Sequence, residues 1–258
     1  HEKNLEGATD GSLVEVSIVG KNTHGLKQAK VEKVIGDINS EKAISLIALH
    51  QHNIPTIFPD DVIAEAEQAS PAPIDKRDDW RDLPLITIDP ADAKDHDDAV
   101  FATPDTEPTN EGGVIVTVAI ADVSWYVRPR SAMDKEAHLR GNSVYFPDRV
   151  VPMLPERISN DLCSLKEGVD RPAIAVRMTF AHDGRKLRHT FHRIMMKSYV
   201  RLSYQEAQAA IDENDAPRAE PWLESVLRPL WQAYEVLQRG RGYRQPLELE
   251  MPERKILL

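Results

Sequence analysis

The sequence is poor in several features that mark specialised classes of protein. A single cysteine, Cys163, cannot form an internal disulfide, which excludes a disulfide scaffold and predicts a reducing compartment, the cytoplasm. The longest apolar run, residues 114–121, is far shorter than the roughly 20 residues of a membrane helix, so no membrane partner is expected. The chain starts without a secretory signal pattern. It also has no glycine-rich phosphate loop, Gly-x-Ser-x-Gly elbow or His-Glu-x-x-His motif, so those catalytic classes find no support.

Positive charge is scarce overall but unevenly placed. The 32 basic and 42 acidic residues give a net charge of −10, which argues against an evenly basic nucleic-acid binder. Residues 75–98 hold nine Asp against four basic side chains, whereas residues 185–201 hold six basic side chains and no acidic one. An acidic pocket and a basic stripe fit a metal-dependent enzyme that acts on a polyanion. Two solvated faces would give the same pattern.

The first 78 residues predict two small parts. Alternating apolar residues at 12–19 and 30–36 predict strands, which we interpret as part of a small β-barrel over residues 1–39. Residues 40–78 predict a helical connector and linker, with helices at 41–49 and 60–69. The chain begins at His1 without Met and ends on an apolar triplet, so we expect both ends to be boundaries within a longer protein.

Residues 79–258 predict a mixed α+β domain. Apolar runs indicate strands at 83–89, 114–120, 173–180 and 187–196, with residues 102–113 as a loop, helices at 203–213 and 222–239, and a strand-like pattern again at 247–258. Asp183-Gly184 is typical of a hairpin turn between the third and fourth strands. We therefore expect a mixed sheet with helices near its C-terminal end.

The sharpest signal is a dense group of carboxylates directly after the first strand of this domain. Asp89 ends the strand, and Asp95, Asp97 and Asp98 follow in a short loop, with Asp92 nearby. Carboxylates packed this closely repel one another and stay ionised only beside strong counter-charges. Oxygen ligands favour Mg²⁺, Mn²⁺ or Ca²⁺ over Zn²⁺, and Mg²⁺ held by carboxylates is a common device for phosphodiester cleavage.

Two other interpretations of this group remain open. A calcium-binding EF-hand loop is disfavoured, because the sixth position counted from Asp89 is not Gly and no Glu stands at the twelfth. A solvated acidic loop that binds nothing is the second. His96, inside the group, could orient a ligand or contact a phosphate, although an exposed loop histidine often has no role. Cys163 is more typical of a small buried residue than of a nucleophile.

Several separate motifs, in order, resemble the ribonuclease II/R (RNB) exoribonuclease family. They lie at residues 87–89 with 95–100, 118–127, 141–147, 151–155 and 162–165. The resemblance covers residue 79 to about residue 258, and residues 1–75 resemble the end of a preceding cold-shock, OB-type domain with its connector. It implies an α+β chain with a partial OB-type barrel, a helical linker and the N-terminal part of an RNB catalytic domain.

This resemblance implies a function and a site. The expected activity is processive 3′→5′ hydrolysis of RNA to nucleoside 5′-monophosphates with Mg²⁺, or Mn²⁺ in its place. Asp89 and Asp98 resemble direct metal ligands, Asp97 resembles the catalytically critical carboxylate, and Asp95 supports both the metal and the chemistry. Tyr145 resembles an aromatic that stacks on the base at the RNA 3′ end, although a core aromatic is the other interpretation.

The remaining expectations concern RNA and the limits of the chain. Arg188, Arg193 and Lys197 of the basic stripe are expected to contact phosphates without sequence preference. The partner is expected to be a single-stranded RNA 3′ end, with structured RNA as an extension, and the protein a monomer. The family's catalytic Arg lies beyond Leu258, so we expect this segment alone to be inactive or nearly so. A non-catalytic RNA-binding module is the alternative function.

Overall fold

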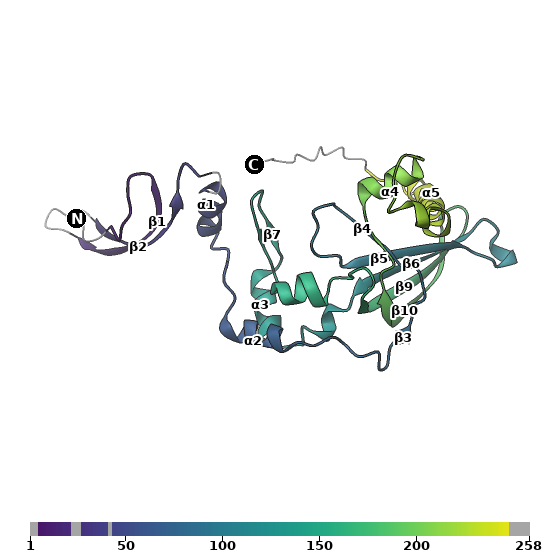
Figure 1. The fold of residues 1–258 in the computed structure, drawn as a ribbon, viewed down its shortest axis with the longest axis horizontal. Coiled ribbons are helices and arrows are strands. Elements are labelled where there is room, and N and C mark those ends of the chain that lie inside the picture. The colour runs from purple at the N-terminus through teal and green to yellow at the C-terminus, as the bar shows by residue number, and fades with distance from the viewer. Residues whose placement is uncertain (1–4, 22–26, 41–42, 248–258) are drawn as a thin grey trace. The chain divides into compact units, whose positions relative to one another are not determined.

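The computed structural model describes residues 5–21, 27–40 and 43–247, so the strand-like pattern at 247–258 lies, apart from Leu247, outside the described residues. The chain forms two compact units, drawn as a ribbon in Figure 1. The first contains the described residues up to Phe58 and Ala137–Met153, and the second contains Pro59–Glu136 and the described residues from Leu154 onward. The domain limits proposed from the sequence stay predictions. No helix in the described ranges is long and apolar enough to cross a bilayer.

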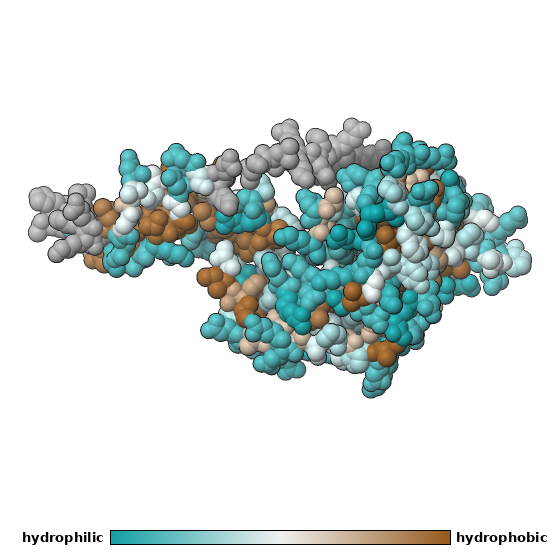
Figure 2. All heavy atoms as spheres, viewed as in Figure 1, coloured by the Kyte–Doolittle hydropathy of each residue, from teal (hydrophilic) through white to brown (hydrophobic). Residues whose placement is uncertain are grey.

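The first unit is built on an antiparallel hairpin, as the alternation of its sequence predicts. Strands β1 (Ser12–Lys21) and β2 (Lys27–Asp37) pair along their length, with three shifts of register. Val16, Ile18 and Val19 are exposed, because a two-stranded sheet has no second layer to cover them. Figure 2 shows the resulting apolar surface over this hairpin.

The rest of the first unit is one helix and a short hairpin. Helix α1 (Ala43–Gln51) confirms the predicted helix, and strands β7 (Val144–Tyr145) and β8 (Val150–Val151) pair antiparallel. Ser45 of the helix donates a hydrogen bond of 2.5 Å to the Asp148 carboxylate in the turn of that hairpin. The hairpin that carries Tyr145 is therefore attached to the helix through its turn.

A five-stranded sheet forms the second unit. Its order is β3-β10-β9-β6-β5, and all pairs are antiparallel except β3 with β10. The strands are β3 (Asp78–Asp79), β5 (Asp98–Pro104), β6 (Val114–Ala121), β9 (Asp170–Phe180) and β10 (Lys186–Lys197). These bounds confirm the predicted strands at 114–120, 173–180 and 187–196, with the hairpin turn at Asp183-Gly184.

Helices and a short parallel pair complete the second unit. Helix α5 (Arg228–Gly242) packs its Ala233 and Val236 against Val114, Val116 and Phe180 of the sheet. Strand β4 (Thr87–Asp89) pairs in parallel with β11 (Arg201–Ser203), which leads directly into helix α4 (Tyr204–Ile211). Helices α2 (Asp60–Gln68) and α3 (Ala132–Arg140), the latter extending into the first unit, complete the helices. Single turns of 3-10 or π helix lie at Pro108–Asn110, Val123–Trp125, Arg157–Leu162, Glu220–Trp222 and Leu223–Leu227.

The structure corrects three details of the sequence interpretation. The loop expected at 102–113 begins too early, since β5 continues to Pro104 and places buried Ala102 in the core. The strand expected at 83–89 is regular only from Thr87. Helix α3 was not predicted, because only Met133 and Glu136 of its nine residues are buried and no apolar stripe marks it. The α+β fold class itself is confirmed.

Gly184 is the position at which the hairpin between β9 and β10 meets helix α5. Its φ is +83°, and an added Cβ would lie 2.4 Å from the Val236 carbonyl oxygen. Gly168 has a φ of +73° but nothing within 4 Å of such a Cβ, so it is a control for the backbone cost alone. The two glycines therefore separate steric overlap from an unfavourable φ.

We expect Gly184→Ala to lower the free energy of unfolding by about 3 kcal/mol, from an unfavourable φ together with the steric overlap. Gly168→Ala should cost about 1–2 kcal/mol, for φ alone. All four tryptophans lie in the second unit, so denaturation followed by tryptophan fluorescence reports on that unit. Equal losses in the two variants would show that the contact with α5 yields without cost.

Candidate active site and metal centre

Asp89 is held at the end of a strand. Its strand β4 runs parallel to β11, and the register places Ser203 opposite Asp89. Ser203 in turn begins α4 through a capping box, in which it and Glu206 satisfy each other's backbone N–H groups. Asp89 is 8% exposed, so its carboxylate lies at the edge of the core. The strand pairing and the helix cap together fix the backbone of Asp89.

Asp97 and Asp98 lie where the neighbouring strand begins. Asp98 is the first residue of β5 and pairs with Ile120 of β6. Asp97 precedes the strand, and its carbonyl accepts a hydrogen bond of 2.8 Å from the Ala121 backbone N–H. Their side chains and that of Asp95 are exposed. The pairing of β5 with β6 thus fixes the backbone of Asp97 and Asp98 while their carboxylates remain accessible.

Three of these carboxylates influence one another electrostatically. Partial burial raises the pKa of Asp98, and the negative charges of Asp97 and Asp89 raise it further. Each additional negative charge here costs free energy that a bound cation would offset. The structure therefore brings Asp89, Asp97 and Asp98 within electrostatic range, as the sequence predicts.

The donor set fits Mg²⁺ or Mn²⁺ in kind. Every candidate ligand is a carboxylate oxygen, and the group carries an excess of negative charge. Within the described ranges, no three His, Cys, Asp or Glu side chains converge into a ready-made metal cage. Mg²⁺ does not require such a cage, because it usually keeps several waters and takes one or two carboxylates together with substrate phosphates. Asp89 and Asp98, supported by Asp95 and Asp97, are the residues that would hold the ion.

His96 is buried, not an exposed loop residue. It is 4% exposed, and its Nδ1 lies 2.7 Å from Oδ2 of Asp89. On the other side of the ring, Nη1 of Arg201 lies 3.2 Å from Nε2. The His96 carbonyl accepts a hydrogen bond of 2.6 Å from the Leu165 N–H. Arg201 was not singled out from the sequence, since 105 positions separate it from His96.

A second buried acid, Asp122, braces the sheet next to the site. Its side chain is fully buried and accepts hydrogen bonds from Arg77 at 2.8 Å and Ser124 at 2.6 Å, while Arg193 lies 3.2 Å away. Burial acts to raise the pKa of Asp122, but the bonds from Ser124 and Arg77 and the charge of Arg193 bring it below the ordinary value. Asp122 therefore stays ionised and paired.

The predicted basic stripe does not lie on one face. Arg188, Arg193 and Lys197 all belong to β10, whose register with β9 has no shift between them. Alternate residues of a strand face opposite sides, so Arg188 lies on one side of the sheet and the other two lie on the other. Lys197 is 3.7 Å from the Asp170 carboxylate, and Arg193 pairs with Asp122. Arg188 donates a hydrogen bond of 3.2 Å to the Thr179 hydroxyl, and its charge helps to lower the pKa of Asp105.

Tyr145 and Cys163 are placed clearly. Tyr145 lies on β7 in the first unit with its side chain 66% exposed, which rules out a core aromatic. Its role in stacking on RNA stays a prediction. Cys163 is buried, and burial raises the pKa of its thiol to about 12, so it remains protonated near neutral pH, as expected of a packing residue.

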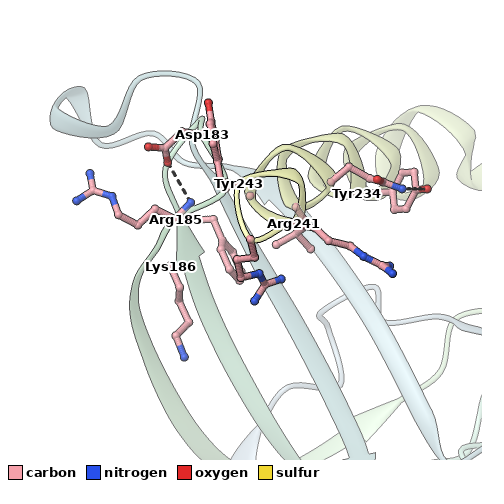
Figure 3. Close-up of a pocket in the computed structure, with 12 residues that line it drawn as sticks. Asp183, Arg185, Lys186, Tyr234, Arg241 and Tyr243 are labelled. Atoms are coloured by element: carbon pink, nitrogen blue, oxygen red, sulfur yellow. Dashed lines mark hydrogen bonds between the residues drawn. The ribbon is translucent and has the colours of Figure 1, made fainter. Parts of the chain in front are cut away.

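A cavity of about 790 Å³ lies elsewhere in the second unit, between the turn of the β9–β10 hairpin and the end of α5. Figure 3 shows the side chains of Arg185, Lys186 and Arg241 at this junction extending in different directions. Cations near the C-terminal end of a helix also stabilise its dipole. None of the carboxylates of the candidate site lines this cavity.

The chain belongs to the RNB family of exoribonucleases. The profile of the RNB domain matches residues 77–258, and that of the cold shock domain matches residues 1–59. Ribonuclease R of Vibrio parahaemolyticus is 40% identical over 259 residues, which cover 97% of this chain and 30% of that protein. The chain thus spans less than a third of the length of this curated relative.

Solved structures show the same fold. Mycoplasma genitalium RNase R in complex with ribose-methylated single-stranded RNA superposes with a TM-score of 0.87 and 25% identity, covering 98% of this chain and 39% of that one. The same enzyme in complex with double-stranded RNA gives a TM-score of 0.82 and 26% identity, over 93% of this chain and 42% of that one. The fold is therefore that of ribonuclease R over nearly the whole chain.

If the carboxylates hold a divalent cation, Asp98→Asn should weaken the binding of Mn²⁺ or Mg²⁺ by tenfold or more. The substitution keeps the shape of the side chain and removes a charged ligand. Isothermal titration calorimetry of both proteins would measure this, with Asp105→Asn as a control, because Asp105 lies at the far end of the hairpin formed by β5 and β6. Equal affinities in the wild type and Asp98→Asn would remove Asp98 from the set of ligands.

Proposed function

We propose that this chain carries the carboxylate centre of a processive 3′→5′ exoribonuclease that hydrolyses RNA to nucleoside 5′-monophosphates. The observation that supports this most directly is the grouping of Asp89, Asp97 and Asp98 where β4 ends and β5 begins, with a raised pKa at Asp98. Membership of the RNB family and the likeness to ribonuclease R provide the class of substrate.

The residues have distinct tasks in this proposal. Asp89 and Asp98 hold the divalent cation, and Asp95 supports them. A bound Mg²⁺ or Mn²⁺ would supply positive charge for the scissile phosphate and lower the pKa of a water molecule. Asp97, whose backbone is fixed but whose carboxylate is accessible, orients the attacking water by accepting its hydrogen bond. The water oxygen forms a bond to phosphorus, and the 3′ oxygen of the preceding nucleotide leaves with a proton.

Binding of RNA is assigned to groups other than these carboxylates. The exposed ring of Tyr145 offers a surface on which any base can stack, which suits degradation without sequence preference. Arg188 is an exposed residue whose charge acts on Asp105 without a salt bridge, whereas Arg193 and Lys197 each form one in the described part of the chain. Arg188 is therefore the best placed of the three predicted cations to contact a phosphate. The proposed setting is the cytoplasm, and the acting species is a monomer.

Asp97→Asn, introduced into the protein that carries this chain, should abolish hydrolysis and leave RNA affinity within about twofold. The amide keeps the shape and removes a carboxylate needed mainly in the transition state, while it reduces repulsion of phosphate. Chromatography of monophosphates released from uniformly labelled RNA measures hydrolysis, and fluorescence anisotropy measures binding.

Two other outcomes would change the assignment. Joint loss of binding and cleavage in Asp97→Asn would make Asp97 a residue of the scaffold. Binding without any hydrolysis by the unaltered protein would favour the alternative, a non-catalytic RNA-binding module. Calorimetry with Mn²⁺ then shows whether the carboxylates hold a metal at all.

Arg188→Ala should reduce the salt dependence of RNA binding by about 0.7 in the slope of log K against log salt concentration, the value for one phosphate contact to a single strand. Lys197→Ala on the opposite side of the sheet should leave the slope unchanged, because its charge already lies beside Asp170. Lys135→Ala, at an exposed position on α3, controls for a general loss of positive charge. A larger loss of slope in Lys197→Ala would place the RNA on that side instead.

A further inference from the structure

His96 lies in a chain of hydrogen bonds that ends at the candidate metal ligand Asp89. Arg201 has only N–H donors in its guanidinium, so Nε2 of His96, 3.2 Å from Nη1, must accept the hydrogen bond. The ring proton of the neutral imidazole is then on Nδ1, which donates to Oδ2 of Asp89 at 2.7 Å. The contact with Arg201 therefore fixes the tautomer of His96, and the Nδ1–H of that tautomer holds the Asp89 carboxylate.

The residues at both ends of this series of hydrogen bonds belong to regular secondary structure. Arg201 and Asp89 lie on the paired strands β11 and β4, where Arg201 is opposite Thr87 and Ser203 is opposite Asp89. The Arg201 backbone N–H donates a hydrogen bond of 3.0 Å to Glu167. Its guanidinium hydrogen-bonds to His96 and forms no salt bridge with a carboxylate among the residues that the structure describes, although its charge helps to lower the pKa of Glu206. A charge placed in this way is available to orient the imidazole.

His96, in the middle of this series of hydrogen bonds, is equally constrained. His96 is 4% exposed, and its own backbone carbonyl accepts a hydrogen bond of 2.6 Å from Leu165. Removal of a buried imidazole whose two nitrogens are both hydrogen-bonded costs more stability than removal of an apolar side chain of the same size, because Arg201 and Asp89 would each lose a partner. Packing alone does not require this pair of contacts.

Resting on the proposed function, we propose that His96 and Arg201 are positioning residues that hold the Asp89 carboxylate in the orientation that binds the divalent cation. Neither residue contacts the cation in this proposal. His96 occupies Oδ2, so Asp89 is restricted to one arrangement and keeps its other oxygen for the metal. Groups that orient a ligand in this way typically change metal affinity 10–100-fold when they are lost.

The test compares two replacements of His96. His96→Phe keeps a ring but removes the donor, and it should weaken Mn²⁺ binding at least tenfold. His96→Asn keeps an N–H near the position of Nδ1, and it should stay within about threefold of the wild type. Arg201→Met, which removes the group that fixes the tautomer, should lie between them. Free Mn²⁺ measured by electron paramagnetic resonance gives each affinity without reference to activity.

A matched control is present in the same unit. Nδ1 of His192 lies 3.1 Å from the Asp78 carboxylate, and Nε2 lies 2.9 Å from the Thr190 hydroxyl, so this histidine has a similar pair of contacts away from the candidate metal ligands. His192→Phe should therefore leave Mn²⁺ affinity unchanged. Thermal unfolding of all four variants separates lost stability from lost metal binding.

Each outcome decides the proposal. Rescue by His96→Asn together with loss in His96→Phe supports it. Unchanged affinity in His96→Phe, or an equal loss in both His96 variants, overturns it. If Asp98→Asn weakens Mn²⁺ binding and His96→Phe does not, the carboxylate centre stands and only the positioning role falls. If the unaltered chain binds no Mn²⁺ at all, both the positioning role and the metal part of the proposed function are wrong.

Discussion

Repulsion between carboxylates is the constraint on which this site depends. Side chains of like charge separate unless the backbone prevents it, and here two strand pairings act against separation. The parallel pair of β4 with β11 holds Asp89, and the antiparallel pair of β5 with β6 holds Asp97 and Asp98. The pairing of strands in these two sheets thus keeps the like charges near one another, and a cation that binds there is stabilised by the same charges.

The buried ion pair of Asp122 with Arg77 supports this arrangement. Asp122 is the first residue after β6. Ala121, the last residue of that strand, donates the backbone hydrogen bond to the Asp97 carbonyl. Loss of one partner from such a pair leaves the other charged and buried, which costs several kcal/mol. The end of β6 is therefore anchored by a strong polar contact next to the point where it positions the backbone of the site. Loss of this ion pair would displace the carboxylates of the site through the strand, although the pair does not contact them directly.

Local sequence patterns predicted the parts of the fold that repeat and missed those that depend on distant contacts. Alternating or continuous apolar residues located β6, β9 and β10, and the Asp-rich segment predicted the candidate site. Strand β5 was not predicted, because its first residue, Asp98, belongs to the acidic group and its last three residues were assigned to a loop. Helix α3 has no apolar stripe, so periodicity could not reveal it.

The side chains around the site show the same division. Asp89, Asp97 and Asp98 are near one another in sequence, so their grouping was predictable, whereas the contact between His96 and Arg201 spans 105 positions. The basic stripe was predicted from composition alone. The alternation of a strand, which composition does not include, divides it between two faces.

Gly184, in the turn between β9 and β10, lies against the backbone of Val236 and Gly240 in helix α5. The turn of the β9–β10 hairpin lies directly against the backbone of α5, and Arg239 donates a hydrogen bond of 2.9 Å to the His182 carbonyl in that turn. The hairpin turn therefore cannot separate from the helix without disturbing its last turns. Sheet and helix end form one cooperative block, so local fluctuations here should involve both together.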